Sequence, residues 1–201
     1  MGDAFELPCI LRLKNEKVAT LCLTTAPDGG ALLEFYRGMA ADDRLFLMDD
    51  VTSVDWLDRF LAKLARGEAI SVIGKVEGKI RGEATLHRTL HGWSRHVGEI
   101  RLNVDRLARG QGLGLALARQ IVKIATDAGI DKLIAQMVDD QPAAKRTFEK
   151  VGFHKEAELP KHVTDIHGKR RNLLIYADDV SHIWSAMETL LDDFRPYRAT
   201  R

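Results

Sequence analysis

Two kinds of hydrophobic spacing divide the first part of the chain into strands and helices. Residues 10–25, ILRLKNEKVATLCLTT, place apolar and β-branched residues on both sides of Asn15-Glu16, which predicts a hairpin that turns there. After Pro27 the apolar residues fall at helical spacing, and they do so again over residues 52–64. The apolar positions of these two predicted helices are Leu32, Leu33, Phe35, Tyr36, Met39, Trp56, Leu57, Phe60, Leu61 and Leu64.

The middle of the chain predicts further strands and one long helix. Residues 69–89 suit a second hairpin that turns at Glu77-Gly78, and residues 97–104 suit another strand. Residues 112–128 then carry apolar side chains on one helical face and stop at a glycine, which commonly ends a helix.

The last part of the predicted domain continues this mixture. A strand over residues 132–138 precedes a short helix that starts at Pro142, where the missing proline N–H is tolerated. Strands near 153–158 and 171–177 complete the sheet. The predicted fold class is therefore α/β.

The C-terminal stretch carries one apolar face at helical spacing. Its members are Val180, Ile183, Trp184, Met187, Leu190, Leu191 and Phe194. One interpretation is a helix packed back on its own domain. The alternative is a homodimer formed through this face, because exposing the large Trp and Phe side chains would be costly.

Composition narrows the class of protein. The 201 residues are 45% hydrophobic and 29% charged, enough to bury one core. A net charge of +1 predicts neither a nucleic-acid nor a membrane partner. Cys9 and Cys22 fit neither a disulfide framework nor a zinc site. With neither a basic-then-apolar N-terminal signal nor an apolar run of about eighteen residues, we predict a cytoplasmic location.

A glycine-rich loop follows the strand at 97–104. Residues 109–114 read Arg-Gly-Gln-Gly-Leu-Gly, and a helix begins directly after them. Glycines let the backbone N–H groups approach an anion, and the helix directs its unpaired amides and positive dipole end at the same place. Arg106, Arg109 and Arg119 add positive charge. The loop therefore suits pyrophosphate, with an ordinary strand-to-helix turn as the alternative.

The spacing argues against two other nucleotide sites. No Lys-Ser or Lys-Thr follows the last glycine, as a P-loop requires. The acidic residue about twenty positions on, Asp131, precedes a strand instead of ending one, which does not suit a dinucleotide site.

Residues 99–153 resemble the GNAT superfamily of acyl-CoA-dependent N-acyltransferases. Residues 109–114 match its coenzyme A signature, Gln/Arg-x-x-Gly-x-Gly/Ala, and PAAKRTFEKVGF at 142–153 resembles its second signature. Weaker similarity extends over about 17–178. The resemblance implies a mixed, mainly antiparallel sheet with helices on both faces in a domain of residues 1–178. A C-terminal helix and basic tail would then occupy 179–201.

The resemblance also implies acetyl-CoA as co-substrate and no metal. The residues that would bind it are Leu102, Asn103, Val104, Arg109, Gly110, Gln111, Gly112, Leu113, Gly114, Gln141 and Phe148. The loop would hold the pyrophosphate, and residues 102–104 would pair with the pantetheine amides, as a free strand edge can. The alternative is that residues 102–104 are ordinary sheet residues paired to a neighbouring strand.

Two positions depart from the family pattern. Gln141 stands where the family usually has Asn, and its amide offers the same donors and acceptor on a longer arm. Phe148 stands where a Tyr commonly protonates the leaving thiolate, and a phenyl ring has no proton to give.

Glu99 is the candidate general base. Attack on a thioester needs a neutral amine, so a group must take a proton. Glu99 lies near the start of a strand beside Val97 and Ile100, where partial burial would raise its pKa, and it matches a position that provides a base in several GNAT enzymes. The alternative is a surface carboxylate paired with Arg101 or Arg95.

The histidines do not predict a metal site. His87, His91 and His96 fall at spacings of four and five across a predicted hairpin, with no cysteine or carboxylate cluster to complete a coordination set. His154, His162 and His167 are scattered.

The predicted function is acetyl transfer from acetyl-CoA to an amine by direct attack in a ternary complex. The acceptor is a small-molecule amine or a protein lysine or N-terminal amine. A non-catalytic acyl-CoA-binding regulatory module is the alternative, and Phe148 is the residue that favours it.

Overall fold

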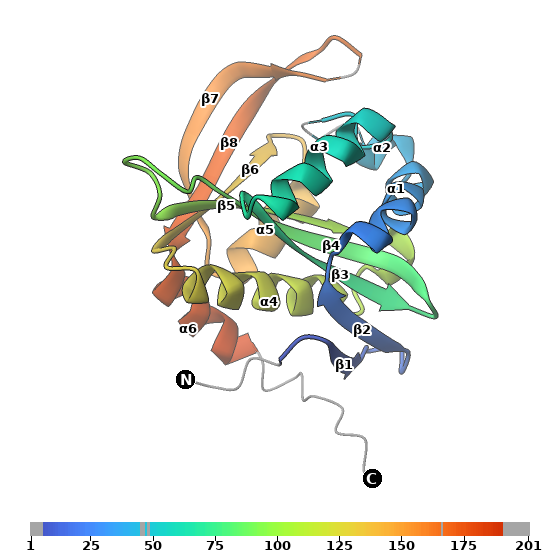
Figure 1. Cartoon of the computed structure of the whole chain (residues 1–201). Helices are drawn as coiled ribbons and strands as arrows, with labels where there is room; N and C mark the ends of the chain where they lie inside the picture. The colour runs from blue at the N-terminus through green and yellow to red at the C-terminus, as the bar shows by residue number, and fades with distance from the viewer. Residues whose placement is uncertain (1–5, 45–46, 48, 166, 191–201) are drawn as a thin grey trace.

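The computed structural model describes residues 6–44, 47, 49–165 and 167–190 (Figure 1). Its centre is an eight-stranded sheet with the order β1-β2-β3-β4-β5-β6-β8-β7. The strands are β1 (Cys9–Arg12), β2 (Val18–Leu23), β3 (Ala69–Val76), β4 (Lys79–Arg88), β5 (Val97–Val104), β6 (Lys132–Val138), β7 (His154–Thr164) and β8 (Arg170–Asp179). The α-helices are α1 (Gly29–Gly38), α2 (Ala41–Arg44), α3 (Val54–Ala65), α4 (Leu113–Asp127), α5 (Pro142–Lys150) and α6 (Val180–Leu190).

Helices cover both faces of this sheet. The helices α1 and α3 lie on one face, and α4 and α6 lie on the other (Figure 1). All neighbouring strands are antiparallel except β5 and β6, which are parallel. The predicted fold class, a mixed and mainly antiparallel sheet with helices on both faces, is confirmed.

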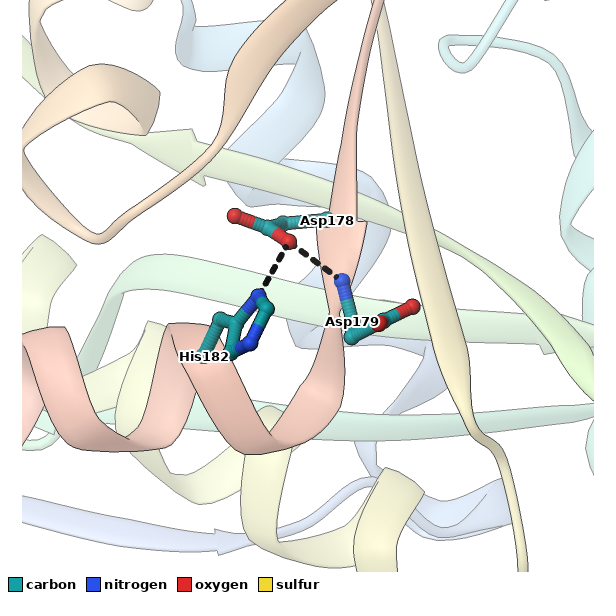
Figure 2. Close-up of side chains that lie close together, drawn as sticks. All are labelled: Asp178, Asp179 and His182. Carbon is teal, nitrogen blue, oxygen red and sulfur yellow. Dashed lines mark hydrogen bonds and ion pairs between the residues drawn. The ribbon is translucent and has the colours of Figure 1, made fainter.

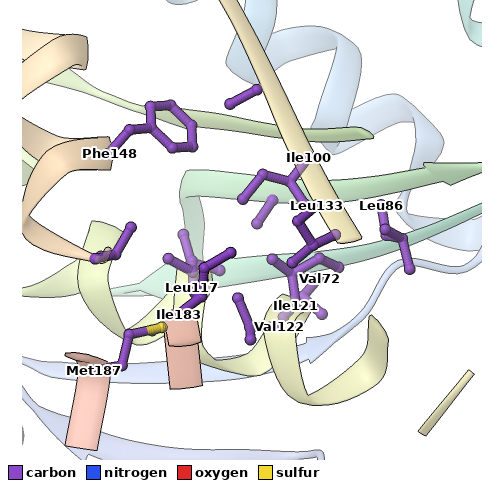
Figure 3. Close-up of a cluster of buried hydrophobic side chains, with 14 of the residues drawn as sticks. Val72, Leu86, Ile100, Leu117, Ile121, Val122, Leu133, Phe148, Ile183 and Met187 are labelled. Carbon is purple, nitrogen blue, oxygen red and sulfur yellow. The ribbon is translucent and has the colours of Figure 1, made fainter. Parts of the chain in front are cut away.

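The helix α4 lies unusually close to the sheet because two strand glycines face it. A Cβ on Gly74 would lie 2.7 Å from Leu113 Cδ1, and one on Gly82 would lie 2.7 Å from Leu117 Cδ1. The larger hydrophobic core fills this interface (Figure 3). The sheet, α4 and α6 contribute the side chains of this core, among them Val72, Leu86, Ile100, Leu117, Ile121, Ile183 and Met187. This packing fixes where α4 begins relative to the end of β5.

The opposite face has its own apolar cluster. Tyr36 contacts Trp56 edge to face, with ring centroids 5.1 Å apart, and Trp56 stacks on Phe60. Ser53 caps α3 by accepting a hydrogen bond from the Trp56 N–H at 3.1 Å. These aromatic contacts hold α1 and α3 against the polar side chains of β4 and β5.

The last two strands are longer than the sequence pattern predicts. The strands β7 and β8 extend to Thr164 and Asp179, beyond the predicted ends at residues 158 and 177. Most side chains of β7 are exposed, so the strand lacks the hydrophobic alternation by which a half-buried strand is recognised. Pairing with β8 defines its length instead.

The described part of the C-terminal stretch packs against α4. Ile183 and Met187 are fully buried, and Trp184 is partly buried with the Arg119 guanidinium 5.6 Å from its ring centroid. Leu191, Phe194 and the basic tail lie outside the described residues. No helix in the described ranges is both long and apolar enough to cross a bilayer.

Candidate active site

The strands β5 and β6 diverge after three residue pairs. Val97, Gly98 and Glu99 pair with residues 132–134 of β6, and the pairing stops there. On its other side β5 stays paired with β4 as far as Val104. One edge of β5 is therefore open beyond Glu99 within the part of the chain that the structure describes.

The alternation of strand hydrogen bonds shows which peptide groups face this opening. The Asp105 N–H donates to the Arg81 carbonyl next to β4, and the His96 carbonyl accepts from the Lys132 N–H next to β6. Odd positions therefore face β4 and even positions face β6. By this alternation, the peptide groups of Leu102 and Val104 face the opening, while the peptide group of Asn103 faces β4.

The glycine-rich loop lies between the end of β5 and the start of α4. Gly110 and Gly112 have φ angles of 72° and 95°, which L side chains rarely adopt. Gly112 is the N-cap of α4 and has no side chain to occupy the first amides of the helix. Leu113 points into the core, so it offers the loop only its backbone. This geometry suits an anion at the helix N-terminus, and the loop of residues 110–114 is called the glycine cradle below.

Arg109 is held in place by two partners. Its Nε donates to the Val104 carbonyl at 3.0 Å, and its guanidinium forms an ion pair with Asp43 at 3.0 Å. Arg106 pairs with the same carboxylate at 2.8 Å. Partial burial opposes ionisation of Asp43, but these hydrogen bonds lower its pKa below the ordinary value. Asp43 thus fixes two arginines beside the cradle.

A pocket opens at the strand divergence. It extends from β5 and β6 to α5 on one side and to α1 and α3 on the other. Four predicted site residues line it, and they are Leu102, Asn103, Gln141 and Phe148. The open edge of β5 and four of the predicted site residues therefore meet at one pocket.

Comparison with known proteins agrees with this geometry. Residues 33–153 match the model of the Acetyltransferase (GNAT) family. The chain belongs to this family. It is also 30% identical over 83 residues to YwnH of Bacillus subtilis (strain 168), named as a candidate phosphinothricin acetyltransferase. That match covers 41% of this chain and half the length of YwnH.

Solved structures share the GNAT fold. One is Mycobacterium smegmatis RimJ in complex with CoA-disulfide, with a TM-score of 0.73, 16% identity, and coverage of 90% of this chain and 92% of RimJ. Another is yncA, a candidate acetyltransferase from Salmonella typhimurium solved with acetyl-CoA. Its TM-score is 0.66, with 19% identity and coverage of 81% of this chain and 94% of yncA.

The two departures from the GNAT pattern both lie at the pocket. The Gln141 Oε1 accepts a hydrogen bond from the Val138 N–H at 2.9 Å, so its Nε2 is the group available to the pocket. Phe148 is largely buried and packs edge to face on Phe153, with ring centroids 5.2 Å apart. Its ring forms an apolar wall.

Glu99 lies beside the pocket and does not line it. Its side chain is 19% exposed, and Oε1 accepts from Arg101 Nε at 2.9 Å. Oε2 accepts from Gln136 Nε2 at 3.4 Å. Arg101 and Gln136 do line the pocket, so Glu99 is one hydrogen bond away from it.

The strand alternation also assembles a polar network that sequence analysis missed. Glu83 is only 1% exposed, and its carboxylate accepts hydrogen bonds from Tyr36, Ser71 and Thr85. The Tyr36 hydroxyl in turn accepts from Asn103 Nδ2 at 3.2 Å. The sequence signal was the polar residues at every second position of 83–87 and of 99–103, which place these side chains on one sheet face.

His87 lies in the same pocket as a neutral imidazole. Burial, reinforced by the nearby charges of Arg101 and Lys63, lowers the pKa of His87 from 6.5 to about 4. At neutral pH it therefore adds no positive charge to the pocket wall.

This pKa predicts a pH dependence of stability. Between pH 6.5 and about 4 the unfolded chain binds a proton at His87 that the folded chain does not, so stability should fall by about 3 kcal/mol as the pH drops through this range. Urea unfolding of His87→Gln should show a smaller loss than the native protein. His162→Gln, at an exposed position, should keep the native slope. Equal slopes for all three proteins would contradict the assignment.

A separate group of ionisable side chains lies where β8 meets α6. Asp178, Asp179 and His182 are close together there (Figure 2). One Asp178 oxygen accepts from the Asp179 N–H at 2.7 Å and lies 3.1 Å from His182 Nδ1. The other lies 3.3 Å from His154 Nδ1. These contacts tie β7, β8 and the first turn of α6 together.

Proposed function

We propose that this chain transfers an acetyl group from acetyl-CoA to an amine. The observation that carries the proposal is the divergence of β5 from β6 directly beside the glycine cradle, with a pocket at the junction. Such an arrangement suits a cofactor with an anionic end and a long arm that contains amides.

The glycine cradle and the open edge of β5 would bind different parts of the cofactor. The backbone amides of residues 110–114 would bind the pyrophosphate, with Arg109 beside them. Leu102 and the Val104 N–H would pair with the pantetheine amides, as an added strand would. Asn103, whose side chain lines the pocket, and the Gln141 Nε2 would contact the thioester end of the arm.

The reaction would be a direct attack on the bound thioester. The amine nitrogen attacks the carbonyl carbon, a C–N bond forms, and the C–S bond breaks with the electron pair leaving on sulfur. Glu99 would take the proton of the incoming ammonium through water, because its hydrogen-bond partners Arg101 and Gln136 lie between its carboxylate and the pocket.

The acceptor is a small-molecule amine or a protein lysine or N-terminal amine. Arg59 and Lys63 line the pocket, and Arg101, which also lines it, is paired with Glu99 and Asp49. The charges of Arg59 and Lys63 suit an acceptor that also carries an acidic group. Phosphinothricin, named for the YwnH relative, is an amine of this kind.

An acceptor panel tests the proposal directly. The native protein is mixed with acetyl-CoA and with phosphinothricin, amino acids, diamines or short peptides, and release of the coenzyme A thiol is measured. We expect amine-dependent thiol release with at least one class. Tight acetyl-CoA binding without thiol release for any amine would favour the alternative, a non-catalytic acyl-CoA-binding regulatory module.

Phe148→Tyr should leave turnover within a few-fold of the native value. A thiol has a pKa near that of cysteine, about 8.5, so the thiolate can leave without a proton from position 148. The measurement is kcat with the fastest acceptor of the panel. A large gain in kcat would show that protonation of the thiolate had been limiting.

A further inference from the structure

The Tyr36–Glu83 pair is the strongest unassigned feature of the pocket. Tyr36 and Glu83 are 4% and 1% exposed, yet both line the pocket. The Tyr36 hydroxyl donates to Glu83 Oε2 at 2.9 Å. Among the described residues that line the pocket, Tyr36 is the only tyrosine.

The partners of Glu83 are all neutral. The Ser71 hydroxyl donates to Oε1 at 2.7 Å, and the Thr85 hydroxyl donates to the same oxygen. Within the described ranges no lysine, arginine or histidine forms an ion pair with this carboxylate. A buried carboxylate without a cation is costly, and a neutral amide could make similar structural hydrogen bonds. The position is therefore better explained by proton chemistry than by stability.

The hydroxyl of Tyr36 lies at the wall of the pocket, beside Asn103 of β5. It accepts a hydrogen bond from Asn103, which follows Leu102 on the open edge of β5. Trp56 and Phe35 contact the Tyr36 ring edge to face and fix its orientation. A nitrogen donor in the pocket can replace the Asn103 amide at this hydroxyl while the bond to Glu83 stays intact.

We propose that Tyr36 and Glu83 form a relay that takes the proton released from the acceptor nitrogen as the amide bond forms. This relay rests on the proposed acetyl transfer. When the C–N bond has formed, the N–H electron pair stays on nitrogen, and the proton passes to the Tyr36 oxygen. The Tyr36 hydroxyl proton passes at the same time to Glu83 Oε2. Glu83 returns the proton through the same hydroxyl to the departing thiolate.

The relay is distinct from the role proposed for Glu99. A nitrogen that enters as an ammonium loses two protons, one before attack and one after it. Glu83 lies opposite Asn103 in the pairing of β4 with β5. Asn103 is four residues along β5 from Glu99, a separation of about 13 Å along the strand. The two carboxylates therefore belong to separate hydrogen-bond networks.

The surroundings favour proton acceptance by Glu83. Burial raises the pKa of Glu83, although the hydroxyl donors and the Asn103 amide oppose this shift. Burial, followed by the charge of Glu83, also raises the pKa of Tyr36, so its hydroxyl stays protonated. The other charged or titratable groups that line the pocket are His87 on β4, Arg101 on β5, Asp49, and Arg59 and Lys63 on α3.

The test compares Tyr36→Phe, Glu83→Gln and the double variant, using the fastest amine of the panel. Each single variant should lower kcat by about a hundredfold, a typical contribution of proton transfer, with acetyl-CoA affinity unchanged. The double variant should be no slower than the slower single variant, because either substitution alone already interrupts the same proton relay. The loss should persist at high pH, because an acceptor that is already neutral still has to lose its second proton.

Tyr176→Phe is the matched control. Its hydroxyl donates to Glu149 at 3.2 Å, outside the pocket, so the same change removes a similar Tyr–Glu hydrogen bond. It should keep the native kcat, and thermal unfolding of all variants separates catalytic loss from lost stability.

Three outcomes overturn the relay or its basis. Native kcat in folded Tyr36→Phe would exclude it. Losses that multiply in the double variant would show two independent roles. If the native protein releases no thiol with any amine, the proposed acetyl transfer itself fails. If the native protein releases thiol and the relay variants are equally active, acetyl transfer stands and the relay alone fails.

Discussion

Gly112→Val should weaken acetyl-CoA binding by about a hundredfold or more, equivalent to about 2.7 kcal/mol. Gly112 has a φ of 95° at the N-cap of α4, where a β-branched side chain is strained by about 1–3 kcal/mol. In the proposed binding mode, its Cβ would also obstruct the approach of the pyrophosphate to the first amides of the helix. Calorimetric titration with acetyl-CoA measures the loss.

Gly129→Val controls for backbone strain in this experiment. Gly129 has a φ of 72° just beyond the other end of α4, and a Cβ there would have no neighbour within 4 Å. This variant should lose stability and keep acetyl-CoA affinity. Arg109→Ala should weaken binding less than Gly112→Val, because the amides remain. A folded Gly112→Val protein with native affinity would remove the cradle from the proposed site.

Glu99→Gln should lower turnover by about a hundredfold at neutral pH while acetyl-CoA affinity is kept. The carboxylate touches the pocket only through Arg101 and Gln136, so its removal should affect proton transfer more than cofactor binding. The loss should shrink as the pH rises, because more of the acceptor is then already neutral. A pH profile of kcat/KM with the fastest panel amine measures it.

Glu68→Gln is a matched control for Glu99→Gln. Glu68 pairs with Arg66 two residues away at 2.7 Å, as Glu99 pairs with Arg101 at 2.9 Å, but it lies outside the pocket. Its replacement should leave turnover unchanged. Full activity of Glu99→Gln at neutral pH would show that another group, or bulk water, removes the proton from the ammonium.

The roles proposed for Glu99 and Glu83 are distinguished by the pH dependence of the activity loss in their variants. Loss at Glu99 should diminish at high pH, whereas loss at Tyr36 or Glu83 should persist. The pH profiles can therefore show separately which group takes the proton lost before attack and which group takes the proton lost after it.

The local pattern of the sequence was sufficient to predict the elements around the proposed cofactor site. Three glycines within residues 109–114, after a strand and before an amphipathic helix, located the cradle, since positive φ angles and helix starts depend on nearby residues. The hairpin turn at Glu77-Gly78 was predicted for the same reason, and both residues have positive φ. In contrast, the full length of β7 was missed because its exposed side chains carry no hydrophobic period.

The pocket depended on contacts between residues far apart in the chain. Tyr36 and Glu83 are 47 residues apart, and Arg109 and Asp43 are 66 apart. Hydrophobic periodicity shows which face of an element is buried but not which element covers it. By itself the sequence determined the fold class, the order of most elements and the glycine cradle. Only the tertiary structure decided that β5 parts from β6 after Glu99 and that Glu83 lies beneath Tyr36, because strand pairing and helix docking are set by packing across the whole sheet.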